Sequence, residues 1–305
     1  MSDKVKGFLF GAVAAATYGM NPLFALPLYR EGLNADSVLF YRYTLAIVML
    51  GIWMKLQRQS FRLNGNEILP LVIAGLLFAA SSLFLFLSYR HMDAGIASTI
   101  LFVYPVMVAV IMALFFHEKA TPVTVASIVL ALSGIALLYR GGDGGPLSFA
   151  GILLVILSAL SYAIYIVGVK QSALKNLSGA KLTFYSLLFG LSIYIVRLDF
   201  CLGLQVVPSW QSWGNVVAIA LLPTVVSLSC TALAIHYIGA TPTAILGALE
   251  PVTAVFFGVA VFGESLTFRL VAGILLIIVS VSLIIAGRTV QKSLNELFRR
   301  LFRRA

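Results

Sequence analysis

Charged residues are scarce in this chain. Asp, Glu, Lys and Arg make up 10% of its 305 residues, whereas hydrophobic residues make up 61%. A soluble domain carries roughly 25% charged residues, so a chain of this composition could not cover its surface for water. The scarcity of charge excludes an ordinary soluble domain and indicates a protein surrounded mostly by lipid.

Cysteine and the common catalytic motifs are also lacking. The two cysteines, Cys201 and Cys230, fall on different apolar segments, which excludes a disulfide framework and a cysteine metal site. No G-x-x-x-x-G-K-[ST], no G-x-G-x-x-G after a strand, no H-E-x-x-H and no G-x-S-x-G is present. We therefore expect no metal, no cofactor and no enzyme activity.

Acidic residues are outnumbered, with 11 Asp and Glu against 21 Lys and Arg. The basic residues gather in short loops and in the tail 288–305, which ends "LNELFRRLFRRA". This placement is typical of membrane orientation and of lipid headgroup contact, and it does not favour nucleic-acid binding. We interpret the tail as a basic, amphipathic, cytoplasmic helix on anionic lipid, in preference to a partner-binding segment.

Long apolar runs are what the chain has in abundance. A membrane-spanning helix needs about 20 mostly apolar residues. The first run is too long for the core of a signal peptide, so we interpret it as an uncleaved span. Ten such runs predict an all-α integral membrane protein: 7–29, 37–56, 68–89, 94–116, 122–139, 147–169, 180–200, 214–237, 240–262 and 268–287.

The distribution of Lys and Arg predicts an orientation. With the N-terminus in the cytoplasm, fifteen of them fall on the cytoplasmic side and five on the outer side, and Arg42 lies within a span. Cytoplasmic loops are enriched in Lys and Arg. Both termini are therefore predicted to be cytoplasmic, in a membrane of the bacterial cytoplasmic (inner) type.

The two halves of the chain, 1–140 and 147–287, resemble each other. At an offset of 144 residues Tyr18 aligns with Tyr162, and at an offset of 146 Pro105 aligns with Pro251. Five spans per half is an odd number, so the second half crosses the membrane with opposite polarity. Inverted repeats of this kind are typical of secondary transporters, whose binding site lies near the midplane between the repeats.

Two segments carry a further resemblance: "LFVYPVMVAVIMALFFHEKATPVTVASIVLALSGIAL" and "LGALEPVTAVFFGVAVFGESLTFRLVAGILLIIVSVSLI". They resemble the paired repeats of the drug/metabolite transporter superfamily, EamA type. The resemblance implies ten helices around a central cavity and efflux of metabolites, amino acids or drugs by alternating access. The first repeat departs from the second at one position, where Tyr104 stands in place of Glu250.

Glu250 is the most unusual residue of the spans. It lies near the centre of its run, where a charged group costs at least about 2.5 kcal/mol. We expect it to face a central cavity and to bind substrate or a coupling proton, although a neutral glutamic acid that only joins two helices is the alternative. Pro105 and Pro251 should kink their helices and act as hinges, and Pro251 should free the carbonyl of Gly247.

Further polar side chains lie along spans that should face the cavity if the resemblance holds. With Glu250 and Tyr104, the expected substrate-binding residues are Tyr18, Asn21, Tyr162, Tyr165, Ser82, Tyr89 and Ser98. Glu118 and Glu264, at the ends of their spans, are expected to cap or pair at the next helix's N-terminus. For Arg42 we expect a snorkelling anchor or an ion pair with Asp36, with anion binding as the alternative.

The leading hypothesis from sequence is a secondary transporter that exports small metabolites or amino acids by alternating access. A multidrug efflux carrier of the same fold is the alternative within the class. An integral membrane enzyme and a channel are the alternatives outside it. We expect a monomer whose partners are a small-molecule substrate, membrane lipid and, as a possibility, a coupling proton.

Overall fold

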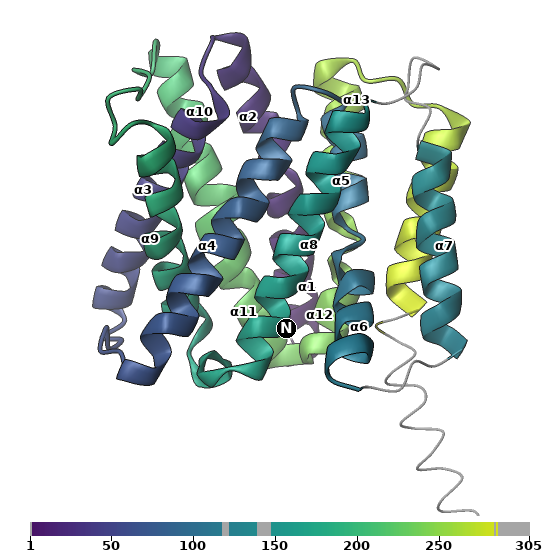
Figure 1. The fold of residues 1–305 in the computed structure, drawn as a ribbon, viewed down its shortest axis with the longest axis horizontal. Coiled ribbons are helices and arrows are strands. Elements are labelled where there is room, and N and C mark those ends of the chain that lie inside the picture. Colours follow the sequence, from purple (N-terminus) through teal and green to yellow (C-terminus); the bar gives the residue numbers. More distant parts are fainter. Residues whose placement is uncertain (1, 118–121, 139–147, 284, 286–305) are drawn as a thin grey trace, which may run out of the picture.

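The chain forms a bundle of ten apolar helices, as the sequence predicts (Figure 1). The computed structural model describes residues 2–117, 122–138, 148–283 and 285. Eight of the helical segments are long and apolar enough to cross a membrane, and two more are apolar but shorter. Within these ranges there is no strand. The basic tail 288–305 and Glu118 lie outside the described residues.

Each half supplies five of the spans. In the first half they are α1 (Asp3–Gly19) with α2 (Asn21–Arg30), α3 (Ala35–Leu56), α4 (Gly65–Ser88), α5 (Ala94–Leu101) with α6 (Tyr104–Phe115), and α7 (Pro122–Leu138). In the second half they are α8 (Phe149–Gln171), α9 (Gly179–Arg197), α10 (Trp210–Ala220) with a π-helical turn (Leu221–Val226) and α11 (Ser227–Ile238), α12 (Ala240–Leu246) with α13 (Leu249–Phe262), and the helix Phe268–Leu283.

Short polar residues set where the spans begin. Asn34 accepts a hydrogen bond from the amide of Ser37 at 2.7 Å, and Ser209 accepts one from the amide of Ser212 at 3.0 Å. Such N-caps satisfy amides that the first turn of a helix leaves without partners. Both caps fall just outside their apolar runs, so these two helices start shortly before their runs begin.

The fourth and ninth spans are each interrupted by a turn just before a proline, at the positions where the sequence predicts a kink. Pro105 lies in the first turn of α6, after a break at 102–103, and Pro251 lies in the first turn of α13, after a break at 247–248. Proline is tolerated in the first turn because the N–H groups of that turn have no hydrogen-bond acceptor within the helix, so the N–H that proline lacks is not missed. Each of these spans is therefore two half-helices that meet inside the membrane.

The contacts between the halves come in matched pairs. Helix α1 packs on α11, and its counterpart α8 packs on α4. Helix α3 packs on its own counterpart α9, and α5 packs on α13. At the level of whole spans, exchange of the two halves leaves this set of contacts unchanged, which is the arrangement expected of a pseudo-two-fold axis between inverted repeats.

Glycine permits close contacts between helices of the two halves. A Cβ added to Gly190 in α9 would lie 2.7 Å from the carbonyl oxygen of Gly75 in α4. A Cβ added to Gly75 would in turn lie 3.0 Å from the amide nitrogen of Gly190. Membrane helices associate through small residues of this kind because lipid supplies little hydrophobic driving force between them.

The bundle has two faces, one at each end of its helices. The N-terminal face holds the start of α1 and the loop 57–64, and the opposite face holds the loops 89–93 and 198–209 (Figure 1). Contacts between the halves tie each face together. On the N-terminal face Tyr185 donates to the carbonyl of Phe61 at 2.5 Å, and on the opposite face Tyr41 donates to the carbonyl of Gln205 at 3.0 Å.

Candidate functional site

A cavity of about 560 Å³ lies between the halves, within the part of the bundle nearer the N-terminal face. Its wall comes from both repeats, as expected for a site on a pseudo-two-fold axis. Most of the wall is apolar or small. The side chains that carry polar groups are Tyr18, Tyr104, Tyr162, Ser227, Thr231, Thr243 and Glu250.

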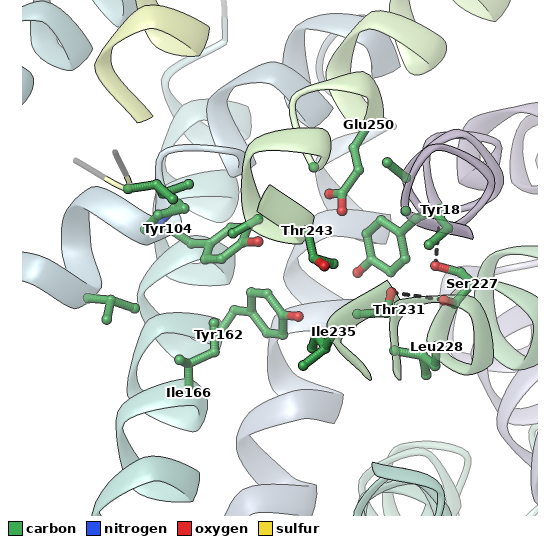
Figure 2. A pocket seen from close by; sticks show the side chains of 18 of the residues that line it. Tyr18, Tyr104, Tyr162, Ile166, Ser227, Leu228, Thr231, Ile235, Thr243 and Glu250 are labelled. Atoms are coloured by element: carbon green, nitrogen blue, oxygen red, sulfur yellow. Dashed lines mark hydrogen bonds between the residues drawn. The ribbon is translucent and has the colours of Figure 1, made fainter. Parts of the chain in front are cut away.

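Glu250 is the one charged residue among those that line the cavity. Figure 2 shows its carboxylate pointing into the space between Tyr18 and Thr243. Its side chain is partly exposed, and within the described ranges no hydrogen bond or ion pair reaches the carboxylate. Glu250 stands in the first turn of α13, where the positive end of the helix dipole favours a negative charge. The carboxylate is thus free to bind a proton or a cation.

Three tyrosines share the cavity with Glu250. The rings of Tyr104 and Tyr162 meet edge to face, with centroids 4.7 Å apart and an interplanar angle of 74°. In Figure 2 their hydroxyls and the hydroxyl of Tyr18 converge on the space below Glu250. The structure thus places the symmetry-matched pair Tyr18 and Tyr162 on the wall of one cavity, as the sequence predicts.

Three hydroxyl residues that the sequence interpretation missed complete the wall. Ser227 donates to the carbonyl of Ala14 at 2.9 Å, Thr231 to that of Ser227 at 2.9 Å, and Thr243 to that of Gly239 at 2.8 Å. Each hydroxyl is held by its own donated bond and keeps its lone pairs available to a ligand. Their signal in the sequence was a Ser or Thr recurring inside apolar runs, such as "SLSCTALAIH".

Five of the expected binding residues do not line the cavity: Asn21, Ser82, Tyr89, Ser98 and Tyr165. The hydroxyl of Ser82 pairs with that of Tyr43 at 3.0 Å in the buried core. Tyr165 lies behind the wall, with its ring stacked on Tyr162 at 5.8 Å. Asn21 donates to the carbonyl of Tyr18 at 2.8 Å, one turn beyond the end of the cavity.

The freed carbonyl expected at Gly247 is not free. It accepts a hydrogen bond from the amide of Glu250 at 2.9 Å, because the chain turns at this point to begin α13. Pro105 lines the cavity, whereas Pro251 is buried outside it. The break, rather than an exposed carbonyl, is what brings Glu250 to the wall.

Arg42 is neither at the surface nor paired with Asp36. Its side chain is 2% exposed, and its Nε donates to the hydroxyl of Thr224 at 2.9 Å. Asp36 instead binds Arg197 of the other repeat, with 2.5 Å between Oδ1 and Nε. The prediction failed because Arg197 and Asp36 meet across the α3–α9 contact, which sequence spacing does not reveal.

Comparison with known proteins places this architecture in a family. The chain matches the EamA-like transporter family model twice, over residues 5–140 and 149–286. An uncharacterized transporter of Bacillus subtilis, YvbV, is 26% identical over 67% of each chain. A second one, YxxF, is 24% identical over 87% of this chain and 86% of its own. A solved structure titled only as a crystal structure of a protein shares the fold, with a TM-score of 0.65 at 17% identity over 91% of this chain and 95% of its own.

Proposed function

Because the chain belongs to the EamA-like transporter family, we propose that it is a secondary transporter that exports small metabolites or amino acids by alternating access. Family membership makes it a membrane transporter rather than an enzyme. The proposal adds a site, in which Glu250 binds the ammonium group of the substrate in one step of the cycle and a coupling proton in another.

The single observation that carries this proposal is the position of Glu250. It is the charged residue of the cavity wall, it has no protein partner within the described ranges, and the tyrosines surround it. A carboxylate in an apolar chamber is stabilised either by protonation or by a cation. Aromatic faces add to cation binding, by about 0.5–2 kcal/mol for each favourable contact.

The side on which the cavity lies supports export. The excess of Lys and Arg supports the predicted orientation, with the N-terminal face and both termini in the cytoplasm of a bacterial-type cell. The cavity then lies toward the cytoplasm, where an exporter loads its substrate. The two half-helix breaks, near Pro105 and Pro251, are the positions at which we expect the halves to bend as access changes.

The test is counterflow in proteoliposomes with purified protein and radiolabelled amines and amino acids. Glu250→Gln keeps the size of the side chain but removes its titratable proton. We expect this variant to fold and insert normally, yet to lose at least about tenfold in transport or to lose its pH dependence. Asp3→Asn, at an exposed acid near the chain start, is the matched control and should transport normally.

Other outcomes discriminate the remaining functions. Transport by Glu250→Gln at wild-type rates across pH contradicts the proposed role of Glu250. Flux that does not saturate indicates a channel. Saturable flux of many unrelated lipophilic cations, with no preference among them, indicates a multidrug carrier, which the mostly apolar cavity wall would also accommodate.

A further inference from the structure

Arg42 is a buried cation that the proposed site does not use. It lies in α3, about 10 Å along the helix from its first residue. The guanidinium carbon lies 5.4 Å from the centre of the Phe86 ring, and Nε donates to Thr224. No carboxylate lies within 4.0 Å of it in the part of the chain that the structure describes. One hydroxyl and one ring face therefore balance this charge.

Such an arrangement is costly without an anion. A charged side chain within the membrane costs at least about 2.5 kcal/mol, and arginines there generally face the protein interior and pair. The nearest acid on the same helix, Asp36, is already bound by Arg197. Arg42 has five N–H donors in a planar fork that matches a carboxylate, and a single protein hydrogen bond is found for it in the described ranges.

Arg42 lies about one helical turn beyond the residues that line the end of the cavity nearer the opposite face. Its partner Thr224 precedes the lining residue Ser227 by three residues, at the junction of the π-helical turn and α11. On α1, Tyr18 lines the cavity and Asn21 follows it by three residues toward the opposite face. Tyr18 is close enough to interact electrostatically with both Arg42 and Glu250. Tyr18 therefore lies near both charged groups, which have opposite sign.

Buried polar atoms accompany Arg42 at this level. Oδ1 of Asn21, which is 3% exposed, has no hydrogen-bond partner in the described structure, and the hydroxyl of Tyr89, which is 7% exposed, lies beside the side chain of Ser98. Tyr89 lies within electrostatic reach of Arg42. Buried polar groups are rarely left unpaired unless they await a water, an ion or a ligand. The Tyr89 hydroxyl can donate to an anion, and Asn21 Oδ1 can accept from an ammonium group.

From this geometry we propose that Arg42 and the hydroxyl of Tyr89 form a second subsite, which takes the carboxylate of the transported molecule. This inference rests on the proposed function, because it places the ammonium group at Glu250. Movement of Tyr18 would join the two subsites when the cavity opens toward the opposite face. The preferred substrate then carries an ammonium and a carboxylate group on one small molecule.

Three probes of one shape test the subsite. Phenylalanine carries both charged groups, phenethylamine only the amine, and 3-phenylpropionate only the carboxylate. Their binding is measured by calorimetry on the full chain in nanodiscs. In the wild type we expect phenylalanine to bind more tightly than either of the others. Arg42→Gln should weaken the binding of phenylalanine by about 10- to 100-fold and change the binding of phenethylamine by no more than about twofold. Arg42→Lys should weaken phenylalanine binding by an intermediate amount.

Tyr89→Phe is the variant that distinguishes loss of the subsite from a folding defect. The change keeps the buried ring and removes only a hydroxyl beside Ser98, so the fold should stay intact. We expect this variant to weaken the binding of phenylalanine by about 5- to 10-fold and to leave the binding of phenethylamine unchanged. Equal effects of these variants on both amines, or equal wild-type binding of both amines, overturns the subsite.

Failure of the proposed function looks different. If neither amine-bearing probe binds, Glu250 is not a cation site, and the function proposed above fails. Arg42-dependent binding of 3-phenylpropionate would still support the carboxylate subsite, and its absence would overturn the subsite as well. If sodium chloride alone raises the melting temperature of the wild type but not of Arg42→Gln, the site holds a free anion, which also overturns the inference.

Discussion

The carboxylate of Glu264 accepts a hydrogen bond from the amide of Ala94 at 2.8 Å, across the boundary between the two repeats. Its other oxygen accepts one from the amide of Gly95 at 3.2 Å, so the side chain caps the first turn of α5. The sequence predicted a cap at the next helix of the chain. The capped helix lies instead in the other repeat, which joins α13 to α5 at the opposite face.

This cap predicts a pH dependence of stability. Burial, aided by the charge of Asp93, raises the pKa of Glu264 to about 7 despite the two amide bonds. The folded protein thus holds this proton more tightly than the unfolded chain does. Its contribution to stability is full below a pH of about 4.5 and is lost as the pH rises toward 7. Melting temperatures across this window should fall by a few degrees more in the wild type than in Glu264→Gln. Parallel curves of melting temperature against pH for the two proteins would contradict this role of Glu264.

The contact between Gly75 and Gly190 predicts a large effect of one methyl group. Gly190→Ala places Cβ 2.7 Å from the Gly75 carbonyl oxygen, so α4 and α9 must separate. We expect a loss of about 1–3 kcal/mol in the free energy of unfolding. Gly214→Ala is the control, because its Cβ meets nothing within 4 Å and alanine favours a helix by about 0.5–1 kcal/mol. Denaturation in mixed micelles measures both, and equal stabilities would refute the close contact.

The edge-to-face pair of Tyr104 and Tyr162 predicts a contribution of the ring, separate from that of the hydroxyl. Tyr162→Ala removes the ring and should weaken phenethylamine binding by about 2- to 10-fold. Tyr162→Phe keeps the ring and should bind more like the wild type. Tyr185→Phe, on the N-terminal face and outside the cavity, is the control. Normal binding by Tyr162→Ala would place the amine elsewhere.

The orientation can be tested with a cysteine that the chain already has. Cys201 is exposed on the opposite face, and Asn176 is exposed on the N-terminal face. With Cys230 replaced by Ala, Cys201 should react with an impermeant maleimide in intact cells. A second protein, in which Cys201 is also replaced and Asn176→Cys is added, should react only after the membrane is opened. Labelling of both in intact cells would rule out the proposed orientation.

The spans and the place of Glu250 could be predicted because their signals are local. A run of about 20 apolar residues is visible in any window of the sequence, and so is an acid at its centre. The matched pair Tyr18 and Tyr162 came from comparison of the two halves of the chain. None of these predictions needed knowledge of which helix faces which.

The partners of polar side chains could not be predicted in the same way. Ser82 has the residue type and depth of a cavity residue, yet packing turns it into the core. Thr231 and Thr243 reach the cavity because of the faces that α11 and α12 present, which follow from contacts between the halves. Proline marked the two breaks correctly but could not distinguish a kinked helix from two half-helices.

The difference between Tyr104 and Glu250 has a consequence for stoichiometry under the proposed function. The repeats match at the neighbouring proline, but one copy carries a neutral phenol and the other a carboxyl group. A single carboxylate on the cavity wall can hold one proton or one monovalent cation at a time. Exchange of one for the other moves no net charge across the membrane. Transport of a purely cationic substrate would then follow the proton gradient and be insensitive to the membrane potential.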